Sequence, residues 1–408
     1  METAPPRTLN LRILGFVALL GFTSGVPLTL TSSTLQLRAQ DAGVDLKTVG
    51  FFALAGLPYT LKFLWSPLLD RYRPPFLGRR RGWILVMTLI TAAMIAWLGQ
   101  VDPARHLAGV AVLALAGAFS SASMDINIDA YRTELLPGRL LGPGVSLHIN
   151  FYRIGMVLAG AVAMFLADRL SWPMAYLLVS LALLPGALAS YLAPEPMAHG
   201  APRTLGEAVV EPFREFLRRK GALEILAFIL LYKLGDNLCT SLNLVFLRHL
   251  GFSKTELALA VKGVGLASLL AGAFLGGWLM SRWSLKRSLW VFGLLQMASM
   301  SCHVALALTG FNRPLMLSTI AIENSIFAMG SVAYVALIQR CCDLRSTATQ
   351  FALLSSLSAL ARVLFASPAG VLADKLGWPA FFLTCMAVAI PGLLLLRRFD
   401  TWQLPEAG

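Results

Sequence analysis

SSASMDINIDAYR, at residues 120–132, is a polar stretch inside a chain that is otherwise strongly apolar. Asp125 and Asp129 lie four residues apart, so they share one face of a helix. The next apolar stretch carries HINFYR at residues 148–153, which adds Asn150 and Arg153. Charged side chains at membrane depth are costly unless they face one another or a water-filled cavity. The two segments therefore predict a transport pathway.

The composition around these segments is typical of a polytopic membrane protein. Of 408 residues, 57% are hydrophobic and 13% charged, and the mean hydropathy is +0.70. Soluble domains carry about 25% charged residues. Windows of roughly 20 mostly apolar residues recur, each long enough to cross a hydrocarbon core about 30 Å thick. We place twelve such spans at residues 12–35, 48–69, 82–100, 106–130, 144–168, 173–193, 222–247, 255–280, 287–309, 314–338, 347–373 and 376–397.

The net charge of +13 indicates orientation in a membrane, and we expect no nucleic-acid partner. If the N-terminus is cytoplasmic, 21 of the 34 Lys and Arg residues fall in segments on that side, 8 on the other and 5 within spans. Positive charge is enriched in cytoplasmic loops. The distribution therefore predicts a multi-pass membrane protein with both termini in the cytoplasm.

The predicted fold is an all-α membrane protein of two six-helix bundles. We expect residues 1–193 to form the N-terminal bundle and residues 222–408 the C-terminal bundle, with residues 194–221 as a cytoplasmic linker. In the linker, Thr204 and Glu207 match a capping box, which predicts an amphipathic helix on the inner leaflet.

The two halves share polar features at matching positions. Each begins with a span that has a polar break, at Ser24-Gly25 and at residues 233–236, and each has an arginine in its fifth span, Arg153 and Arg362. Both intervals, 24 to 233 and 153 to 362, equal 209 residues. Such a repeat favours a carrier that binds its substrate between two bundles near mid-membrane.

Ionisable and polar side chains recur inside the predicted spans. We expect Asp125, Asp129 and Glu323 to be candidates for proton coupling, with Asp125 preferred and Arg153, if close, stabilising its charge. The side chains expected to bind substrate are Gln36, Tyr59, Lys62, Asn150, Arg153, Lys233, Asp236, Lys262, Asn324, Gln350 and Arg362. Each alone is equally well explained as a member of a buried ion pair that holds two helices together, but the whole set is hard to explain by packing.

A basic loop, SPLLDRYRPPFLGRRRGW at residues 66–83, follows the second predicted span. Its acid can pair with the arginines or cap a neighbouring helix end. Either contact would brace the bundles at the cytoplasmic face, whereas the alternative is a topology signal alone. The residues of this predicted cytoplasmic gate are Asp70, Arg71, Arg79, Arg80 and Arg81.

The sequence predicts neither a cofactor nor a metal site. Its cysteines are odd in number and argue against a disulfide framework, so we expect them to fill the core. They are Cys239, Cys302, Cys341, Cys342 and Cys385. The sequence contains no H-E-x-x-H, G-x-S-x-G or P-loop motif, and KLGD at 233–236 only partly matches an intramembrane aspartyl protease motif, so an enzyme is the weaker alternative. A channel or sensor is the third class, and accumulation against a gradient would exclude a channel.

Several segments resemble the AmpG muropeptide permease family of the major facilitator superfamily. They are LGFTSGVPLTLTSSTLQ (20–36), DLKTVGFFALAGLPYTLKFLWSPLLDRYRPPFLGRRRGW (45–83), SASMDINIDAYRTELLP (121–137), YRIGM (152–156), LAPEP (192–196), LYKLGD (231–236), ENSIFAMG (323–330) and ATQFALLSSLSALARV (348–363). The resemblance extends from about residue 12 to 397. It implies a proton-driven importer that brings anhydro-muropeptides, the GlcNAc-anhydroMurNAc peptides, into the cytoplasm for peptidoglycan recycling. Where a chromosomal β-lactamase is inducible, this uptake feeds the induction signal.

The resemblance further implies a small glycopeptide substrate, protons and the lipid bilayer as partners, and we expect a monomer. Some members of the family carry two further C-terminal helices. The two predicted bundles are complete without them, so we expect transport. The alternative substrate is a siderophore similar to pyochelin or yersiniabactin, because carriers of the same superfamily branch import such compounds.

Overall fold

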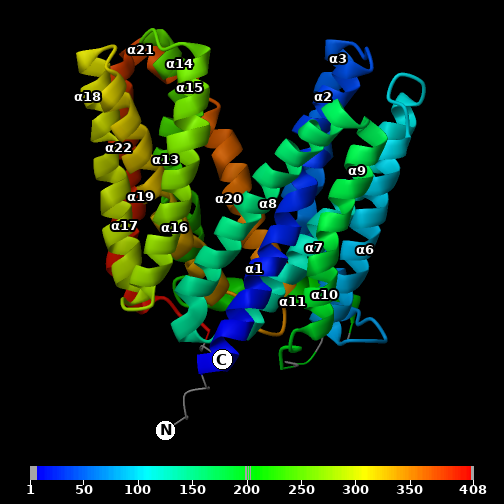
Figure 1. The fold of residues 1–408 in the computed structure, drawn as a ribbon. Coiled ribbons are helices and arrows are strands. Elements are labelled where there is room, and N and C mark those ends of the chain that lie inside the picture. The colour runs from blue at the N-terminus through cyan, green and yellow to red at the C-terminus, as the bar shows by residue number, and fades with distance from the viewer. Residues whose placement is uncertain (1–6, 198–199, 201, 203, 406–408) are drawn as a thin grey trace.

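The computed structural model describes residues 7–197, 200, 202 and 204–405, and the secondary structure of this described part is helical throughout (Figure 1). The predicted all-helical membrane fold is therefore confirmed. In the N-terminal half the α-helices are α1 (Arg7–Leu30), α2 (Ser33–Asp41), α3 (Leu46–Phe51), α4 (Leu57–Leu61), α5 (Ser66–Arg71), α6 (Arg79–Gln100), α7 (Leu107–Leu135), α8 (Leu141–Arg169), α9 (Trp172–Ser180) and α10 (Leu184–Leu192).

The linker helix α11 (Leu205–Arg218) connects this half to the C-terminal half. The helices that follow are α12 (Ala222–Leu231), α13 (Leu234–Ser241), α14 (Asn243–His249), α15 (Lys254–Leu259), α16 (Leu266–Met280), α17 (Leu285–Ser299), α18 (Ser301–Thr309), α19 (Arg313–Arg340), α20 (Thr347–Ala366), α21 (Ala369–Leu376) and α22 (Trp378–Leu395). The capping box predicted for α11 is present, with Thr204 and Glu207 bonding reciprocally.

Eleven helical segments of the described chain are long and apolar enough to cross a membrane. The second of the twelve predicted spans, 48–69, is the exception. It is divided into α3, α4 and α5 by the 3₁₀ turns η1 (Phe52–Gly56) and η2 (Lys62–Leu64). Pro58 and Pro67 stand in the first turns of α4 and α5, where a missing N–H is tolerated but a continuous helix would lose a hydrogen bond. This segment is therefore a series of short helices, and it is not among the eleven that are long enough to cross a membrane.

Of the two predicted polar breaks, one is present and the other is not. The chain leaves helical geometry at Lys233, between α12 and α13. At Ser24-Gly25, by contrast, α1 continues without interruption to Leu30. Gly25 allows α1 and α8 to approach each other closely, because a Cβ atom at this position would lie 2.0 Å from the carbonyl oxygen of Tyr152 on α8. The prediction of a break there was wrong, and the small residue allows helix packing.

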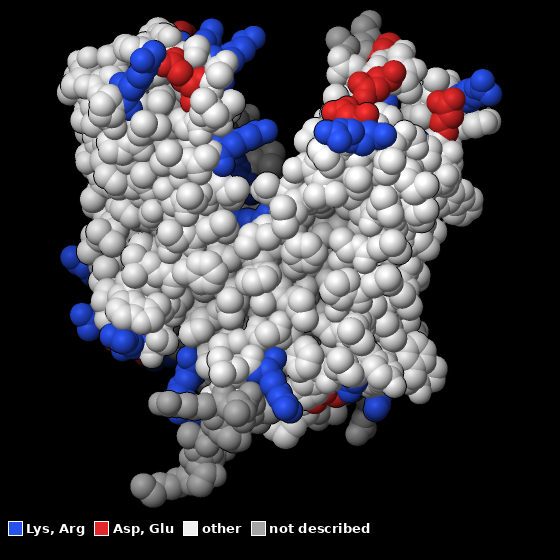
Figure 2. Space-filling view, viewed as in Figure 1, with Lys and Arg blue, Asp and Glu red and all other residues white. Residues whose placement is uncertain are grey.

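The helices form two bundles that meet near the chain termini and diverge at the other end (Figure 1). Figure 2 shows the resulting hollow between the bundles, and the charged side chains visible inside it are basic. Two apolar clusters join the bundles. One contains Leu141, Val145, Ala273, Ala328, Val332 and Ala336. The other contains Leu69, Ile126, Ala130, Ala348 and Ala352. The interface between α8 and α16 and that between α5 and α20 therefore close one end of the molecule.

Candidate functional site

The acidic pair of α7 lies in the N-terminal bundle, on a helix that packs against α20 of the opposite bundle. Asp129 is bound by two cations, since Lys62 Nζ lies 3.2 Å and Arg132 Nη2 2.8 Å from its carboxylate oxygens. Asp125, 9% exposed, accepts a hydrogen bond of 2.5 Å from Ser24 Oγ on α1. It forms no ion pair with any described residue. The two acids therefore have different surroundings although they share one helix face.

An aromatic ring from the C-terminal bundle covers the cations of this pair. Phe351 on α20 lies with its ring centroid 5.9 Å from Lys62 Nζ and 5.2 Å from the Arg132 guanidinium carbon. A cation over an aromatic face is attracted by the ring quadrupole. The contact links the charge state of α7 to the position of the opposite bundle.

The remaining predicted polar groups of the N-terminal bundle are poorly satisfied. Arg153 is half-buried, its Nη1 has no hydrogen-bond partner, and it forms no ion pair with a described residue. Asn150 donates to the Leu270 carbonyl of α16 at 3.3 Å, but its Oδ1 and the buried hydroxyl of Tyr59 have no partner. Gln36 is half-buried on α2. Unpartnered polar atoms are rare inside proteins, so these groups are available to a ligand.

A second basic site lies in the C-terminal bundle. A cavity of about 250 Å³ is lined by Lys233 and Arg362 together with Asn237 and the hydroxyl groups of Ser331, Tyr334, Ser355 and Ser358. Lys233 pairs with Asp236 at 3.1 Å, and its Nζ lies 4.2 Å from the centre of the Phe327 ring. Two cations with several hydroxyl groups form a surface suited to carboxylate and sugar groups.

Three other predicted binding residues lie apart from that cavity. Lys262 is exposed on the π-helical turn η5 (Ala260–Gly265). Asn324 donates to the carbonyl of Ile320 in its own helix at 2.8 Å. Gln350 is 1% exposed and hydrogen-bonded through both amide atoms, to the Asp343 N–H and to the Pro212 carbonyl among others. In this conformation Gln350 ties the linker to α20 and does not face the hollow.

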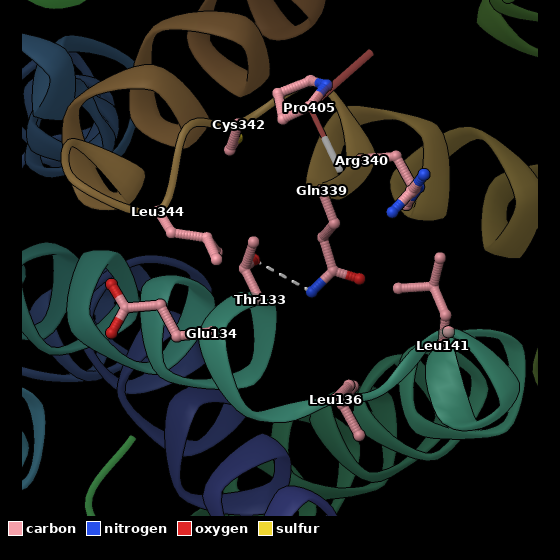
Figure 3. A pocket seen from close by; sticks show the side chains of 10 residues that line it. Thr133, Glu134, Leu136, Leu141, Gln339, Arg340, Cys342, Leu344 and Pro405 are labelled. Carbon is pink, nitrogen blue, oxygen red and sulfur yellow. Dashed lines mark hydrogen bonds between the residues drawn. The ribbon is translucent and has the colours of Figure 1, made fainter. Parts of the chain in front are cut away.

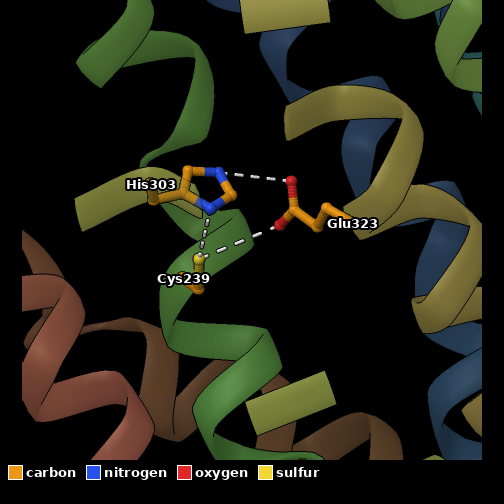
Figure 4. A group of neighbouring side chains, drawn as sticks. All are labelled: Cys239, His303 and Glu323. Carbon is orange, nitrogen blue, oxygen red and sulfur yellow. Dashed lines mark hydrogen bonds and ion pairs between the residues drawn. The ribbon is translucent and has the colours of Figure 1, made fainter. Parts of the chain in front are cut away.

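Glu323, a candidate for proton coupling, lies in a separate buried cluster (Figure 4). Its oxygens lie 3.3 Å from His303 Nε2 and 3.8 Å from Cys239 Sγ. Asn243 donates to the same carboxylate at 3.1 Å. The sequence does not bring these residues together, and the carboxylate is 8% exposed.

Asp70 of the predicted gate joins the two bundles. Its carboxylate accepts hydrogen bonds from the backbone N–H groups of Thr349 at 2.8 Å and Ala348 at 3.3 Å, and from the Thr349 hydroxyl at 2.7 Å. Ser346, the residue at the N-cap of α20, makes no side-chain cap bond. An acid of the N-terminal bundle therefore caps a helix of the C-terminal bundle, where the helix dipole favours negative charge.

Of the gate arginines, Arg80 binds the Asp70 carboxylate within the N-terminal bundle, and the other three contact neighbouring groups. Arg80, 1% exposed, bonds to Asp70 at 2.7 Å and to Glu134 at 2.5 Å. Arg79 reaches Glu134 at 3.3 Å, and Arg81 donates to the Ser190 carbonyl at 2.9 Å. Arg71 lies over the ring of Tyr72.

Two further contacts close the same end of the molecule. Gln339 at the end of α19 donates to the Thr133 hydroxyl of α7 at 3.1 Å, beside a cavity of about 40 Å³ (Figure 3). Arg219, after the linker helix, binds Glu215 and the carbonyl of Cys341. Both bundles and the linker therefore share one hydrogen-bonded network.

Four residues contact predicted site residues in the structure but are not among the residues that the sequence predicts for the site. They are Ser24, Arg132, Phe351 and His303. A signal exists only for Arg132, because the i, i+3 spacing after Asp129 favours an ion pair on one helix. The others lie far from their partners in the sequence, so only the fold brings them together.

Comparison with known proteins identifies the relatives of this architecture. Residues 17–364 match the family model of the Major Facilitator Superfamily. The anhydromuropeptide permease of Escherichia coli K12 is 45% identical over 381 residues, which is 93% of this chain and 78% of that protein. A putative transporter AmpG 4 of Rickettsia conorii is 31% identical over 94% of this chain and 96% of its own length. Among solved structures, the E. coli fucose:proton symporter FucP superposes with a TM-score of 0.73 at 15% identity, covering 94% of this chain and 97% of that one.

Proposed function

We propose that this chain imports anhydromuropeptides across the bacterial inner membrane by proton-coupled alternating access. The premise is its family: the chain belongs to the major facilitator superfamily and, within it, to the family of the E. coli anhydromuropeptide permease. The sequence identity to that permease carries the proposal. The imported fragments enter peptidoglycan recycling, and in a host with an inducible β-lactamase they supply the induction signal.

The basic cavity of the C-terminal bundle supports this choice of substrate. The peptide part of a muropeptide carries carboxylates, and the sugar part carries hydroxyl groups. Lys233 and Arg362 offer donors to carboxylates, while the surrounding serine hydroxyls suit the sugar. Arg153 offers a further donor from the N-terminal bundle, because its Nη1 has no hydrogen-bond partner among the described residues. A ligand between the bundles would therefore satisfy groups from both halves.

Proton coupling is assigned to Asp125. Asp129 keeps its charge balanced by Lys62 and Arg132, whereas Asp125 forms no ion pair with a described residue and accepts a hydrogen bond from the Ser24 hydroxyl. An unpaired carboxylate inside a membrane is costly, and a bound proton removes that charge. Ser24 lies on α1 and Asp125 on α7, so protonation changes a contact between two helices that border the hollow.

The conformation corresponds to a carrier open on the side opposite its chain ends. The positive-inside distribution puts those ends in the cytoplasm, so the hollow faces the periplasm. Opening toward the cytoplasm requires that Asp70 leave the N-terminus of α20 and that Gln339 leave Thr133. These contacts act as the cytoplasmic gate.

A displacement experiment distinguishes the substrate classes. Purified protein in detergent is equilibrated with radiolabelled GlcNAc-anhydroMurNAc-tripeptide, and unlabelled competitors are added. The same muropeptide should displace the label, whereas ferric pyochelin should not. Absence of displaceable muropeptide binding, together with saturable binding of labelled ferric pyochelin in a parallel assay, would assign the chain to siderophore import instead.

A further inference from the structure

A cluster of one cysteine, one histidine and one glutamate lies inside the C-terminal bundle (Figure 4). Cys239 comes from α13, His303 from α18 and Glu323 from α19. The cysteine sulfur lies 3.8 Å from His303 Nδ1 and 3.8 Å from one glutamate oxygen, and the other oxygen lies 3.3 Å from His303 Nε2. The side chains are 1%, 0% and 8% exposed.

These side chains satisfy one another only in part, because Cys239 contacts both His303 and Glu323 while other polar atoms of the group have no partner. His303 Nε2 is buried without a hydrogen bond although the glutamate is close, and the Oδ1 atom of Asn243, whose amide nitrogen donates to Glu323, also has no partner. Nearly all buried polar atoms in proteins are hydrogen-bonded. Two exceptions beside a thiol and a carboxylate indicate a site that is built for a ligand.

The donor set and its spacing fit a zinc ion. Zn²⁺ takes thiolate sulfur at about 2.3 Å, imidazole nitrogen at about 2.0–2.1 Å and carboxylate oxygen at about 2.0–2.2 Å, in tetrahedral geometry. Those bond lengths put the ligand atoms roughly 3.3–3.6 Å from one another. With His303 Nδ1 as the ligand atom, Cys239 Sγ lies 3.8 Å from that nitrogen and 3.8 Å from one Glu323 oxygen. Taken one per residue, the three ligand atoms lie within 4.8 Å of one another, so a shift of about 1 Å brings them to tetrahedral spacing. Asn243 adjoins the site, since its amide nitrogen donates to Glu323 at 3.1 Å.

We propose that Cys239, His303 and Glu323 form a Zn²⁺ site that ties α13 to α18 and α19. On binding, the cysteine releases its thiol proton to solvent, and the thiolate and the carboxylate together balance the charge of the ion. The complex is neutral, so it avoids the cost of a net charge inside a membrane-embedded bundle. Because α13 begins directly after the break at Lys233, the ion would fix the helix that carries Asn237 of the substrate cavity.

Metal content and cobalt spectroscopy test the site without any transport assay. Purified protein is incubated with ZnCl₂, dialysed and analysed for bound zinc, and a parallel sample receives CoCl₂ for detection of a thiolate-to-cobalt charge-transfer band. The wild type should retain one zinc per chain and show the band. Cys239→Ser should lose the band. Its zinc affinity should fall by more than roughly 10–100-fold, which is the loss that removal of an outer-shell partner causes.

Cys385→Ser is the matched control, because Cys385 is equally buried in the same bundle and lies outside the cluster. It should retain both the zinc and the band. Glu323→Gln, which preserves size, should weaken zinc binding while the thermal unfolding midpoint without metal shows that the protein is folded. Absence of stoichiometric zinc from folded wild type, or retention of the cobalt band by Cys239→Ser, would overturn the proposal.

Discussion

At the residue scale, the membrane-embedded charges fall into a balanced group and an unbalanced one. Asp129, Lys62 and Arg132 form a closed set beneath the ring of Phe351. Asp125 and Arg153 have no ion-pair partner in the described chain. A buried ion pair is weak evidence for function, since such pairs also serve structure. The unpaired residues are therefore the better candidates for binding protons and substrate.

This division predicts opposite stability effects for two similar substitutions. Asp129→Asn leaves Lys62 and Arg132 without their counter-charge, and breaking a buried pair costs about 3–5 kcal/mol. Asp125→Asn still offers Ser24 an acceptor, so it should cost no more than the roughly 0.5–1.5 kcal/mol of one hydrogen bond. Unfolding midpoints of the two purified variants in detergent measure the difference. Equal losses of stability would contradict the assignment.

The sequence predicts candidate charged residues for the site but not the partners that they have in the structure. Periodicity puts Asp125 and Asp129 on one face of a helix, and both lie on α7. It gives no information on partners from other helices, so Gln350, which looks like a free polar group in the sequence, is in fact bonded to the linker. The Cys239 cluster escapes prediction for the same reason, since its members come from three helices.

At the element scale, irregular backbone marks the pathway more clearly than long helices do. The second span is a series of short turns that carries Tyr59 and Lys62. Lys233 stands at a break, and Lys262 lies on a π-helical turn. Non-helical backbone at membrane depth is tolerated where it borders a cavity, and π-turns often occur at functional sites. Hydropathy predicts a span at each place but does not resolve where the hydrogen-bond ladder is interrupted.

Helix packing by a small residue gives a prediction within a single helix. Gly25→Ala puts a methyl group against the Tyr152 carbonyl, so α1 and α8 must separate, and overpacking of this kind costs about 1–3 kcal/mol. Gly15→Ala, also in α1, meets no atom within 4 Å and should gain about 0.5–1 kcal/mol from helix propensity. Thermal unfolding of both variants tests this. Comparable effects of the two substitutions would argue against close packing at Gly25.

The cap that Asp70 provides to α20 predicts a conformational shift. Asp70→Ala removes an N-cap worth about 0.5–2 kcal/mol and takes one partner from Arg80. Because 1.4 kcal/mol changes an equilibrium tenfold, the gate should open in a larger fraction of molecules. Spin labels at Arg139 and Arg345, which are exposed in different bundles, report that opening as a longer distance in pulsed electron resonance.

Arg282→Gln is the control for this experiment. Arg282 is exposed and lies over Trp278 of its own half, between α16 and α17. Its substitution should leave the distance distribution unchanged. An unchanged distribution in Asp70→Ala as well would mean that the cap does not hold the gate.

At the scale of the whole molecule, the sequence predicts two similar bundles, and the structure shows how differently they are equipped. The N-terminal bundle holds the carboxylates of α7 and the gate acid, whereas the C-terminal bundle holds the basic cavity and the Cys239 cluster. The repeat of 209 residues is visible in the sequence. The division of roles is not, because it depends on which side chains of each bundle face the hollow.

Elements of the two bundles contact each other at the end near the termini. The clusters at α8 with α16 and at α5 with α20 close the end near the termini. Access from that end requires these apolar contacts and the Asp70 cap to separate together. In the proposed mechanism, a single proton on Asp125 would bias this equilibrium through α1 and α7.

The most direct test of proton-coupled import is accumulation of labelled anhydromuropeptide in proteoliposomes under an imposed inward proton gradient. One pH unit corresponds to about 1.4 kcal/mol, or roughly tenfold accumulation per proton. Wild-type protein should concentrate the label and lose it when an uncoupler is added. Asp125→Asn should exchange internal for external label but not accumulate it. Accumulation by Asp125→Asn equal to that of the wild type would contradict the account.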